Sequence, residues 1–360
     1  MTKKEKQSFG RLSDKRETTL YTLSRKDFTV KISDYGATVV SLIIKNPYTG
    51  EHTDLVLGFD SAAQYESDSS CFGGVCGRFA NRIKNACFSL NGKEYKLAAN
   101  NNGNHLHGGN IGFHKKLWTA EFIENGISLI YVSPDGEEGY PGNLQARVTY
   151  TITEDNALII EYGASSDKDT IINFTNHSYF NLCGHDSGNI LNQSLQLNAT
   201  EYTPIDTTSC PTGEILSVKG TPFDFTSFHT LGERIHSSHP QMIKGNGYDH
   251  NFVIDKTGDF DYMQNLPLAA TAFSPSNSLG LRLFMKVYTD KPGVQLYTGN
   301  FISEKTKGKS GAIYGPRHGF CLETQYFPDS INHSNFPSPV LKSDQKYRFK
   351  TIYQFSYVKH

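Results

Sequence analysis

Strict alternation of apolar and polar residues is the feature that most constrains how this chain can fold. The segment FTVKI, residues 28–32, places Phe28, Val30 and Ile32 on one face, which is the period of a half-buried strand. Tight-turn signals separate such segments along the whole chain. Asn91-Gly92 and Asn125-Gly126 each join two alternating arms, and TEDN (153–156) joins two more. The pattern predicts an all-β protein built as one large antiparallel β-sandwich.

Helical periodicity and domain boundaries are both scarce in the sequence. Two short segments, residues 60–67 and 226–236, are the helix candidates. No repeat or low-complexity linker divides the chain, so we expect a single domain over residues 21–360. Residues 1–20 are charged, and no apolar run follows them, so we expect a flexible N-terminal extension rather than a signal peptide.

Bulk composition excludes several classes of partner. The net charge is −1, which does not favour binding to nucleic acid or to an anionic membrane. No segment approaches the ~18 consecutive apolar residues that a membrane-spanning helix needs. The six cysteines form no CxxC pair, so we expect reduced, mostly buried thiols. Two of the five N-x-S/T sequons, at Asn173 and Asn176, lie where a glycan would block a predicted cleft, so we expect a cytoplasmic protein.

The stretch NFTNHSYFNLCGH (173–185) carries hydrogen-bonding groups on one face of a predicted strand. At period 2 that face holds Asn173, Thr175, His177, Tyr179 and Asn181, without the Lys or Glu of an ordinary solvated surface. Such a face suits a cleft for a polar small molecule. Taken alone, His177 is more often a satisfied structural histidine.

Two shorter motifs add candidate binding groups. GRFANRI contains Asn81 and Arg82, and adjacent strand residues both reach one ligand only near a strand end or bend. NHLHGG contains His105 and His107, which a continuous strand would place on the same face as a possible metal pair. Further ligands at a fitting spacing are not evident, so we expect no metal.

Carboxylates complete the inventory. Glu323 follows the apolar residues Phe320 and Leu322 in FCLETQ, where a charge is costly unless it is partnered or functional. GYDHNF supplies Asp249, and GVQLYTGN supplies Gln295 with Tyr297 two residues later. Neither type of glycine-rich nucleotide-binding loop is present. These residue types together are typical of a carbohydrate site with an acid and a base.

Seven motifs in this order resemble the aldose 1-epimerase (galactose mutarotase) family. The motifs, spread over residues 77–325, are GRFANRI, NHLHGG, GFHKKLW, NHSYFNL, GYDHNF, GVQLYTGNF and GFCLETQ. The resemblance implies a galactose mutarotase-like supersandwich whose open cleft binds a free hexose such as galactose or glucose. It also implies that no cofactor is needed.

Carried over by motif, the resemblance makes Glu323 the general base and His177 the general acid. The residues that would hold sugar hydroxyls and the ring oxygen are Asn81, Arg82, His107, Asp249 and Gln295. Tyr179 either lines the cleft beside them or holds His177 in place. Two departures from the expected motifs are His114, which is expected to change the cleft rim, and Phe79, which is expected to be a packing variation.

Three alternatives stay open at this point. Asp249 and Glu323 could form the carboxylate pair of a glycoside hydrolase or lyase. A carbohydrate-binding module would need the cleft but neither Glu323 nor His177. A phosphosugar epimerase would need a basic cluster, for which the candidates are Lys115, Lys116 and Arg317. The preferred hexose is left undecided, and a monomer or homodimer is expected.

Overall fold

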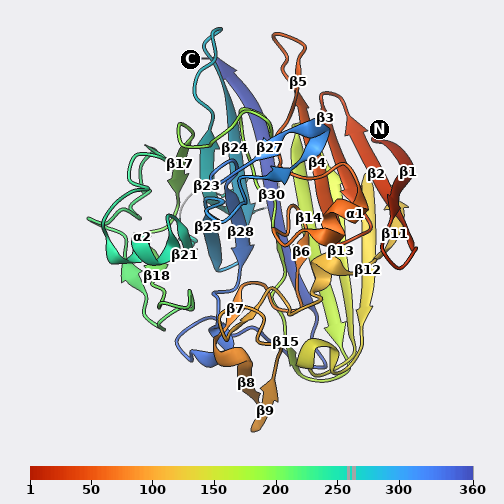
Figure 1. Ribbon diagram of the computed structural model, residues 1–360, viewed down its shortest axis with the longest axis vertical. Coiled ribbons are helices and arrows are strands. Elements are labelled where there is room, and N and C mark those ends of the chain that lie inside the picture. Colours follow the sequence, from red (N-terminus) through yellow and green to blue (C-terminus); the bar gives the residue numbers. More distant parts are fainter. Residues whose placement is uncertain (258–259, 262–264, 360) are drawn as a thin grey trace.

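The computed structural model describes residues 1–257, 260–261 and 265–359, and its regular structure is dominated by antiparallel strands. The largest sheet has ten strands and runs through the molecule in Figure 1. Its strands, in spatial order, are β11 (Thr119–Ile123), β12 (Gly126–Ser133), β13 (Leu144–Ile152), β14 (Ala157–Ser166), β30 (Tyr347–Lys359), β24 (Leu281–Thr289), β23 (Leu266–Phe273), β17 (Ser194–Leu197) and β20 (His229–Thr230), with β22 (Phe260–Asp261) paired to β23. The predicted all-β, antiparallel fold class is confirmed.

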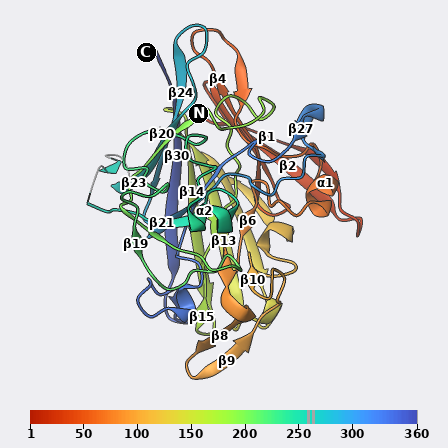
Figure 2. The same cartoon turned by 60° about the vertical axis from the view of Figure 1, so that its left-hand side comes forward.

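Two five-stranded sheets accompany the large one. The first has the order β1 (Lys3–Arg11), β2 (Glu17–Arg25), β3 (Phe28–Ser33), β4 (Thr38–Lys45) and β5 (His52–Asp54). The second has the order β19 (Leu216–Ser217), β18 (Glu201–Thr203), β21 (Asp249–Val253), β25 (Gly293–Tyr297) and β28 (Cys321–Gln325). The rotated view in Figure 2 shows the first sheet lying against the long strands β13 and β14.

Short elements connect these sheets. The two-stranded pairs are β6 (Val75–Cys76) with β16 (Thr175–Asn176), β7 (Arg82–Ile83) with β10 (His105–Leu106), β8 (Cys87–Leu90) with β9 (Lys93–Lys96), β15 (Thr170–Ile171) with β29 (Val340–Leu341), and β26 (Thr306–Lys307) with β27 (Ile313–Tyr314). The helical segments are α1 (Ala62–Ser67), α2 (Pro240–Gly245) and the 3₁₀ turns η1 (Lys84–Ala86), η2 (Phe113–Lys115), η3 (Glu137–Gly139), η4 (Lys309–Gly311) and η5 (Ser330–Asn332). None of the helices in the described ranges has the length and apolar character that crossing a membrane requires.

One hydrophobic cluster joins all three large sheets. It contains Val30 of β3, Val148 of β13 and Val294 of β25, each fully buried. Along β13 the even-numbered residues face this core while the odd-numbered side chains are exposed or half-buried, as the alternating sequence predicts. Full burial of one such apolar side chain stabilises the fold by roughly 1.5–3 kcal/mol. The alternation therefore fixes which face of each strand packs.

The three predicted hairpins are all present. Leu90 pairs with Lys93 around Asn91-Gly92, whose φ angles of 51° and 76° are those of a tight hairpin turn. The second predicted hairpin is present as well, but Ile123 pairs with Gly126, so its two turn residues are Glu124 and Asn125, one position before the predicted Asn-Gly turn. The TEDN turn joins β13 to β14.

Residues 226–236 do not form the predicted helix. His229 and Thr230 form β20 instead, which pairs with β17. A Cβ on Gly232 would lie 2.9 Å from the Leu191 backbone, so the chain passes too close to its neighbour for a regular helix with side chains there. Residues 60–67 do contain α1, whereas α2 was not predicted.

Residues 1–20, for which we expected a flexible extension, contain the strand β1 and the start of β2. β1 pairs with β2 along almost its whole length. Phe9 and Leu12 are buried in a cluster with Tyr65 of α1. β1 is an edge strand whose side chains, apart from Phe9, are exposed, so its sequence lacks the alternation of a half-buried strand.

The fold also buries a lysine among aromatic rings. Lys291 is 0% exposed, its ammonium lies 4.1 Å from the Phe349 ring centre and 4.5 Å from that of Tyr347, and it donates to the Tyr347 hydroxyl. Burial lowers the pKa of Lys291 well below its ordinary value, although the charge of Asp290 acts in the opposite direction. The unfolded chain therefore binds this proton more tightly than the folded protein does.

This difference predicts a pH-dependent stability. Because the folded pKa of Lys291 is lowered, stability is lost as pH falls below the unfolded value near 10.4, and it rises from pH 7 towards pH 10. We expect the Lys291→Met variant to show a smaller rise, by up to about 1.4 kcal/mol per pH unit. Urea unfolding of both proteins at several pH values measures this, and parallel curves would contradict it.

Candidate functional site

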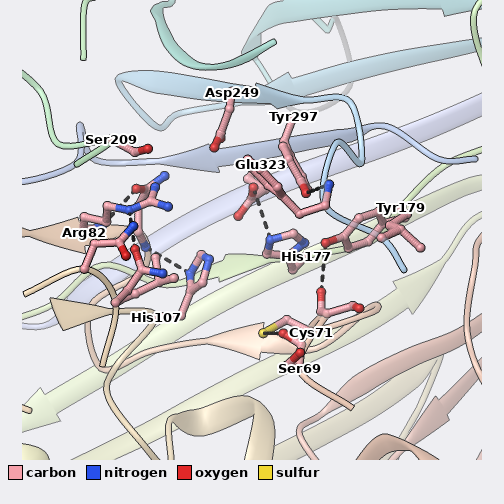
Figure 3. A pocket seen from close by; sticks show the side chains of 17 residues that line it. Ser69, Cys71, Arg82, His107, His177, Tyr179, Ser209, Asp249, Tyr297 and Glu323 are labelled. Carbon is pink, nitrogen blue, oxygen red and sulfur yellow. Dashed lines mark hydrogen bonds and ion pairs between the residues drawn. The ribbon is translucent and has the colours of Figure 1, made fainter. Parts of the chain in front are cut away.

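A cavity of about 360 Å³ lies between the second five-stranded sheet and the loops that precede β6 and follow β10. Figure 3 shows its side chains pointing inward from both sides. Its lining residues are Ser69, Ser70, Cys71, Asn81, Arg82, Asn101, Asn102, Leu106, His107, His177, Tyr179, Ser209, Asp249, Tyr297, Phe301, Ile302 and Glu323. The lining is polar at its centre, which suits a small hydroxylated molecule.

Glu323 is the buried carboxylate of this cavity. It lies in the middle of β28, directly opposite Gln295 of β25, and only 2% of it is exposed. Its Oε2 atom is buried and has no hydrogen-bond partner among the described residues. Burial raises the pKa of Glu323 to about 7, with Asp249 adding to the rise and His177 and Arg82 opposing it. A carboxyl with that pKa accepts and returns a proton readily near neutral pH.

His177 faces Glu323 from the opposite wall. Its Nε2 atom lies 3.5 Å from Glu323 Oε1, and Figure 3 marks this contact. The Tyr179 ring stacks on the imidazole at 4.9 Å and 22°, and the Tyr179 hydroxyl donates to the Ser70 carbonyl. Tyr179 therefore lines the cavity and also orients His177, so it fills both of the roles that the sequence analysis offered as alternatives.

Asn81 and Arg82 reach the cavity together because the backbone bends between them. Asn81 has a left-handed φ of 62° and comes directly before β7, which starts at Arg82. The Arg82 side chain donates from Nε to Asn101 Oδ1 at 3.0 Å, which fixes the guanidinium at the cavity wall. From the sequence, Asn81 and Arg82 required a bend or a strand end to reach one ligand, and the structure has such a bend at Asn81.

The two histidines of NHLHGG separate, against the prediction of a shared face. β10 ends at Leu106 and His107 adopts a φ of 50°, so the period-2 relation is broken between them. His105 is fully buried and bonds the Ala98 carbonyl and the Tyr140 hydroxyl, whereas His107 lines the cavity. Burial lowers the pKa of His107 well below its ordinary value.

His107 is therefore a neutral donor at the cavity wall. Its Nδ1 atom accepts from the Asn81 backbone N–H at 3.1 Å, so the ring proton of the neutral imidazole is on Nε2. His107 lies beside His177, with 5.2 Å between ring centres.

Asp249 lines the cavity, but Gln295 does not. Gln295 donates from Nε2 to Asp249 Oδ1 at 2.7 Å, and its own Oε1 accepts from Gln325 at 3.1 Å. The structure thus places Gln295 behind Asp249 instead of among the lining residues. Burial raises the pKa of Asp249, while Arg82 and this hydrogen bond counteract the rise.

Several lining residues were not identified from the sequence. They come from loops, namely Ser69 to Cys71, Asn101, Asn102, Ser209, Phe301 and Ile302. Loops have no hydrophobic period, so no pattern marks which of their side chains face a ligand. Tyr297 was noticed beside Gln295, and of the two it is Tyr297 that lines the cavity.

The two departures from the motifs lie away from the cavity lining. Phe79 is fully buried against Ile83 and Phe88, which agrees with the predicted packing variation. His114, which was expected at the cleft rim, lies instead beside Cys71 and Cys76.

Metal ligation at the cavity itself was not expected from the sequence. His107, His177 and Glu323 nevertheless offer ligand atoms within 4.8 Å of one another. Since His107 Nδ1 already accepts a backbone hydrogen bond, one side of its ring is occupied. The absence of a metal stays a prediction.

The chain is similar in sequence and in structure to proteins of one family. A family profile described as aldose 1-epimerase matches residues 19–354. The chain is 42% identical to galactose mutarotase of Sus scrofa over 336 residues, 93% of each protein. It is 37% identical to aldose 1-epimerase of Escherichia coli (strain K12) over 331 residues, 91% of each. The crystal structure of galactose 1-epimerase from Lactobacillus acidophilus NCFM is 28% identical and superposes with a TM-score of 0.83 over the full length of both chains.

Proposed function

The chain belongs to the aldose 1-epimerase family and is an isomerase that acts on sugars, and from this premise we propose that Glu323 and His177 carry its proton transfers. The reaction interconverts the α and β anomers of a free aldohexose. The ring opens when the O1 hydroxyl loses a proton and the ring oxygen O5 gains one. Rotation about C1–C2 then turns the aldehyde, and the ring closes on the other face of C1.

Glu323 acts as the general base on O1. Its unpartnered Oε2 is the acceptor that the O1 hydroxyl would occupy, and this orphaned buried oxygen is the observation that carries the proposal. His177 donates its Nε2 proton to O5. O1 and O5 are bonded to the same carbon, so an acid and a base whose side chains approach to 3.5 Å, between His177 Nε2 and Glu323 Oε1, can serve both. Ring closure returns both protons, and the enzyme ends in its starting state.

The remaining lining groups hold the sugar. Arg82 and the neutral His107 present N–H donors, and Asp249 presents a carboxylate that can accept from two hydroxyls. Gln295 acts through Asp249 by fixing its orientation. A ring of donors and acceptors around a hexose-sized cavity supports galactose and glucose as substrates.

Polarimetry of freshly dissolved α-D-galactose and α-D-glucose tests the activity. We expect the protein to raise the rate of rotation change well above the spontaneous rate measured in the same buffer. Protein that leaves both rates at the spontaneous value would overturn the proposal.

The charge of the lining argues against a phosphosugar substrate. Among the described residues that line the cavity, Arg82 is the one with a fixed positive charge. Lys116 pairs with Glu137 at 2.6 Å outside the lining, and Lys115 and Arg317 also lie outside it. We expect glucose 6-phosphate to be a poorer substrate than glucose, and the reverse order would favour the phosphosugar alternative.

The pH dependence follows from the Glu323 pKa of about 7. The base must be deprotonated to accept from O1, so kcat/KM is expected to fall as pH drops below 7. The fitted midpoint of this acidic limb reports the free enzyme. A midpoint near 4.5, the ordinary value of a glutamate, would show that Glu323 is not the group that titrates.

The compartment and the assembly state are further parts of the proposal. All six cysteines are free thiols, and the sequon residues Asn173 and Asn176 are buried, with 0% and 2% exposed. Both facts support a cytoplasmic protein. We propose a monomer or homodimer, which light scattering of the purified chain distinguishes.

A further inference from the structure

Three potential metal ligands lie together beside the acid–base pair and take no part in the proposed reaction. Ligand atoms of Cys71, Cys76 and His114 all lie within 4.8 Å of one another. Cys76 is fully buried, while Cys71 and His114 are partly buried. Of the three, Cys71 also lines the sugar cavity. The cluster is therefore reached from the cleft.

The fold brings these residues together from separate elements. Cys76 is held on β6, where it pairs with Thr175 of β16, and His114 lies on η2. Gly74 makes room for the imidazole, because a Cβ there would lie 2.8 Å from the Cβ of His114. The close approach of His114 to the two thiols thus depends on glycine between the cysteines.

The chemistry of the three groups suits a thiophilic cation. Thiol sulfurs and an imidazole nitrogen are soft and borderline ligands, which such a cation prefers to oxygen. The thiolate is the form that ligates metal. His114 Nδ1 is buried and has no hydrogen-bond partner among the described residues. No hydrogen bond at Nδ1 therefore determines which of the two ring nitrogens carries the proton.

We propose that Cys71, Cys76 and His114 form a binding site for a borderline-soft divalent cation of the Zn²⁺ class, and that an ion bound there slows the isomerase. Two sulfurs and one imidazole are a ligand set that zinc takes in proteins, and they leave one of its usual four positions for water. A hard cation such as Mg²⁺ or Ca²⁺ prefers oxygen ligands and is not expected to bind.

The loop that carries the cluster is hydrogen-bonded to His177. The Gly73 N–H donates to the His177 carbonyl, and the His177 N–H donates to the Gly74 carbonyl, both at 2.9 Å. An ion that fixes Cys71 against Cys76 and His114 restrains the backbone that positions the acid. The effect on turnover rests on the proposed function, whereas the binding of the ion does not.

Binding is tested on the full-length, chelator-treated protein by titration with Co²⁺ in the presence of a reductant. We expect one ion per chain and a thiolate-to-metal charge-transfer band, which Zn²⁺ then abolishes by displacement. Cys76→Ala and His114→Asn should each weaken binding at least about tenfold, since even the loss of an outer-shell partner costs that much. Cys183→Ala and Cys87→Ala, whose thiols lie outside the cluster, serve as matched controls and should bind as the parent does.

The outcomes are distinct. If no charge-transfer band appears with the parent protein, the site is wrong. Binding that survives Cys76→Ala and His114→Asn but is lost in His107→Asn would place the ion on the His107, His177 and Glu323 trio, and would also overturn the proposal. For the second part, Zn²⁺ should slow galactose mutarotation by the parent and much less by His114→Asn, which keeps its activity in metal-free buffer. Binding without any change in rate would overturn that part while leaving the isomerase assignment intact.

Discussion

Glu323→Gln is expected to lower kcat by at least about 10²- to 10⁴-fold while galactose binding is largely retained. The amide has nearly the same shape as the carboxylate but cannot take the O1 proton. The side chains that we propose to hold the sugar, Arg82, His107 and Asp249, come from other elements and are untouched. Stopped-flow or conventional polarimetry gives kcat, and calorimetric titration with galactose gives the affinity. Equal loss of turnover and binding would show that Glu323 holds the sugar and is not the base.

The same variant separates lost chemistry from lost folding. The folded pKa of Glu323 is raised from 4.5 to about 7, so the charged carboxylate costs stability as pH rises through that window. At pH 8 this cost is on the order of 3 kcal/mol, because each pKa unit corresponds to about 1.4 kcal/mol. Glutamine carries no charge, so we expect the free energy of unfolding of Glu323→Gln to equal or exceed that of the parent at pH 8. A large drop would attribute inactivity to unfolding.

The strands and turns could be predicted because their determinants are local. Alternation and Asn-Gly turns act over a few residues, and they correctly indicated β8 with β9, β11 with β12 and β13 with β14. The helix predicted for residues 226–236 is absent because a distant segment of the chain determines the conformation there. The Leu191 backbone, far away in sequence, lies against Gly232 and decides the local conformation. β1 was not predicted because an exposed edge strand buries too few side chains to produce an alternating sequence pattern.

The chemical groups of the site could be predicted from the sequence, but which of them line the cavity and which lie behind the lining could not. Motif resemblance named Glu323 and His177, and both line one cavity. Period-2 reasoning placed Gln295 with Tyr297, yet only the structure shows that Gln295 stands behind Asp249. Likewise, a single left-handed residue at His107 separates it from His105, and a φ of 50° leaves no trace in an alternation count. Backbone bends at the ends of short strands set which side chains reach the cavity.

His177→Asn is expected to lower kcat by a similar factor, about 10²- to 10⁴-fold, because asparagine cannot donate a proton to O5 as an acid. Its side chain still fits beside Tyr179, so the cavity wall is retained. His185→Asn is the matched control, since that half-buried histidine is on the same stretch of chain and bonds Tyr314 outside the cavity. Its activity should equal that of the parent. Polarimetry on both variants makes the comparison, and a mildly affected His177→Asn would mean that O5 is protonated by another group.

A variant that combines Glu323→Gln with His177→Asn distinguishes residues that act together from residues that act independently. Ring opening needs the O1 proton removed and the O5 proton delivered within one event, so loss of either group already forces the slow, water-mediated route. We therefore expect Glu323→Gln combined with His177→Asn to be about as slow as the slower single variant, as residues that act as a unit are strongly non-additive. Multiplication of the two single losses would show instead that Glu323 and His177 act in separate steps, with the 3.5 Å contact between them serving only to hold the side chains in place.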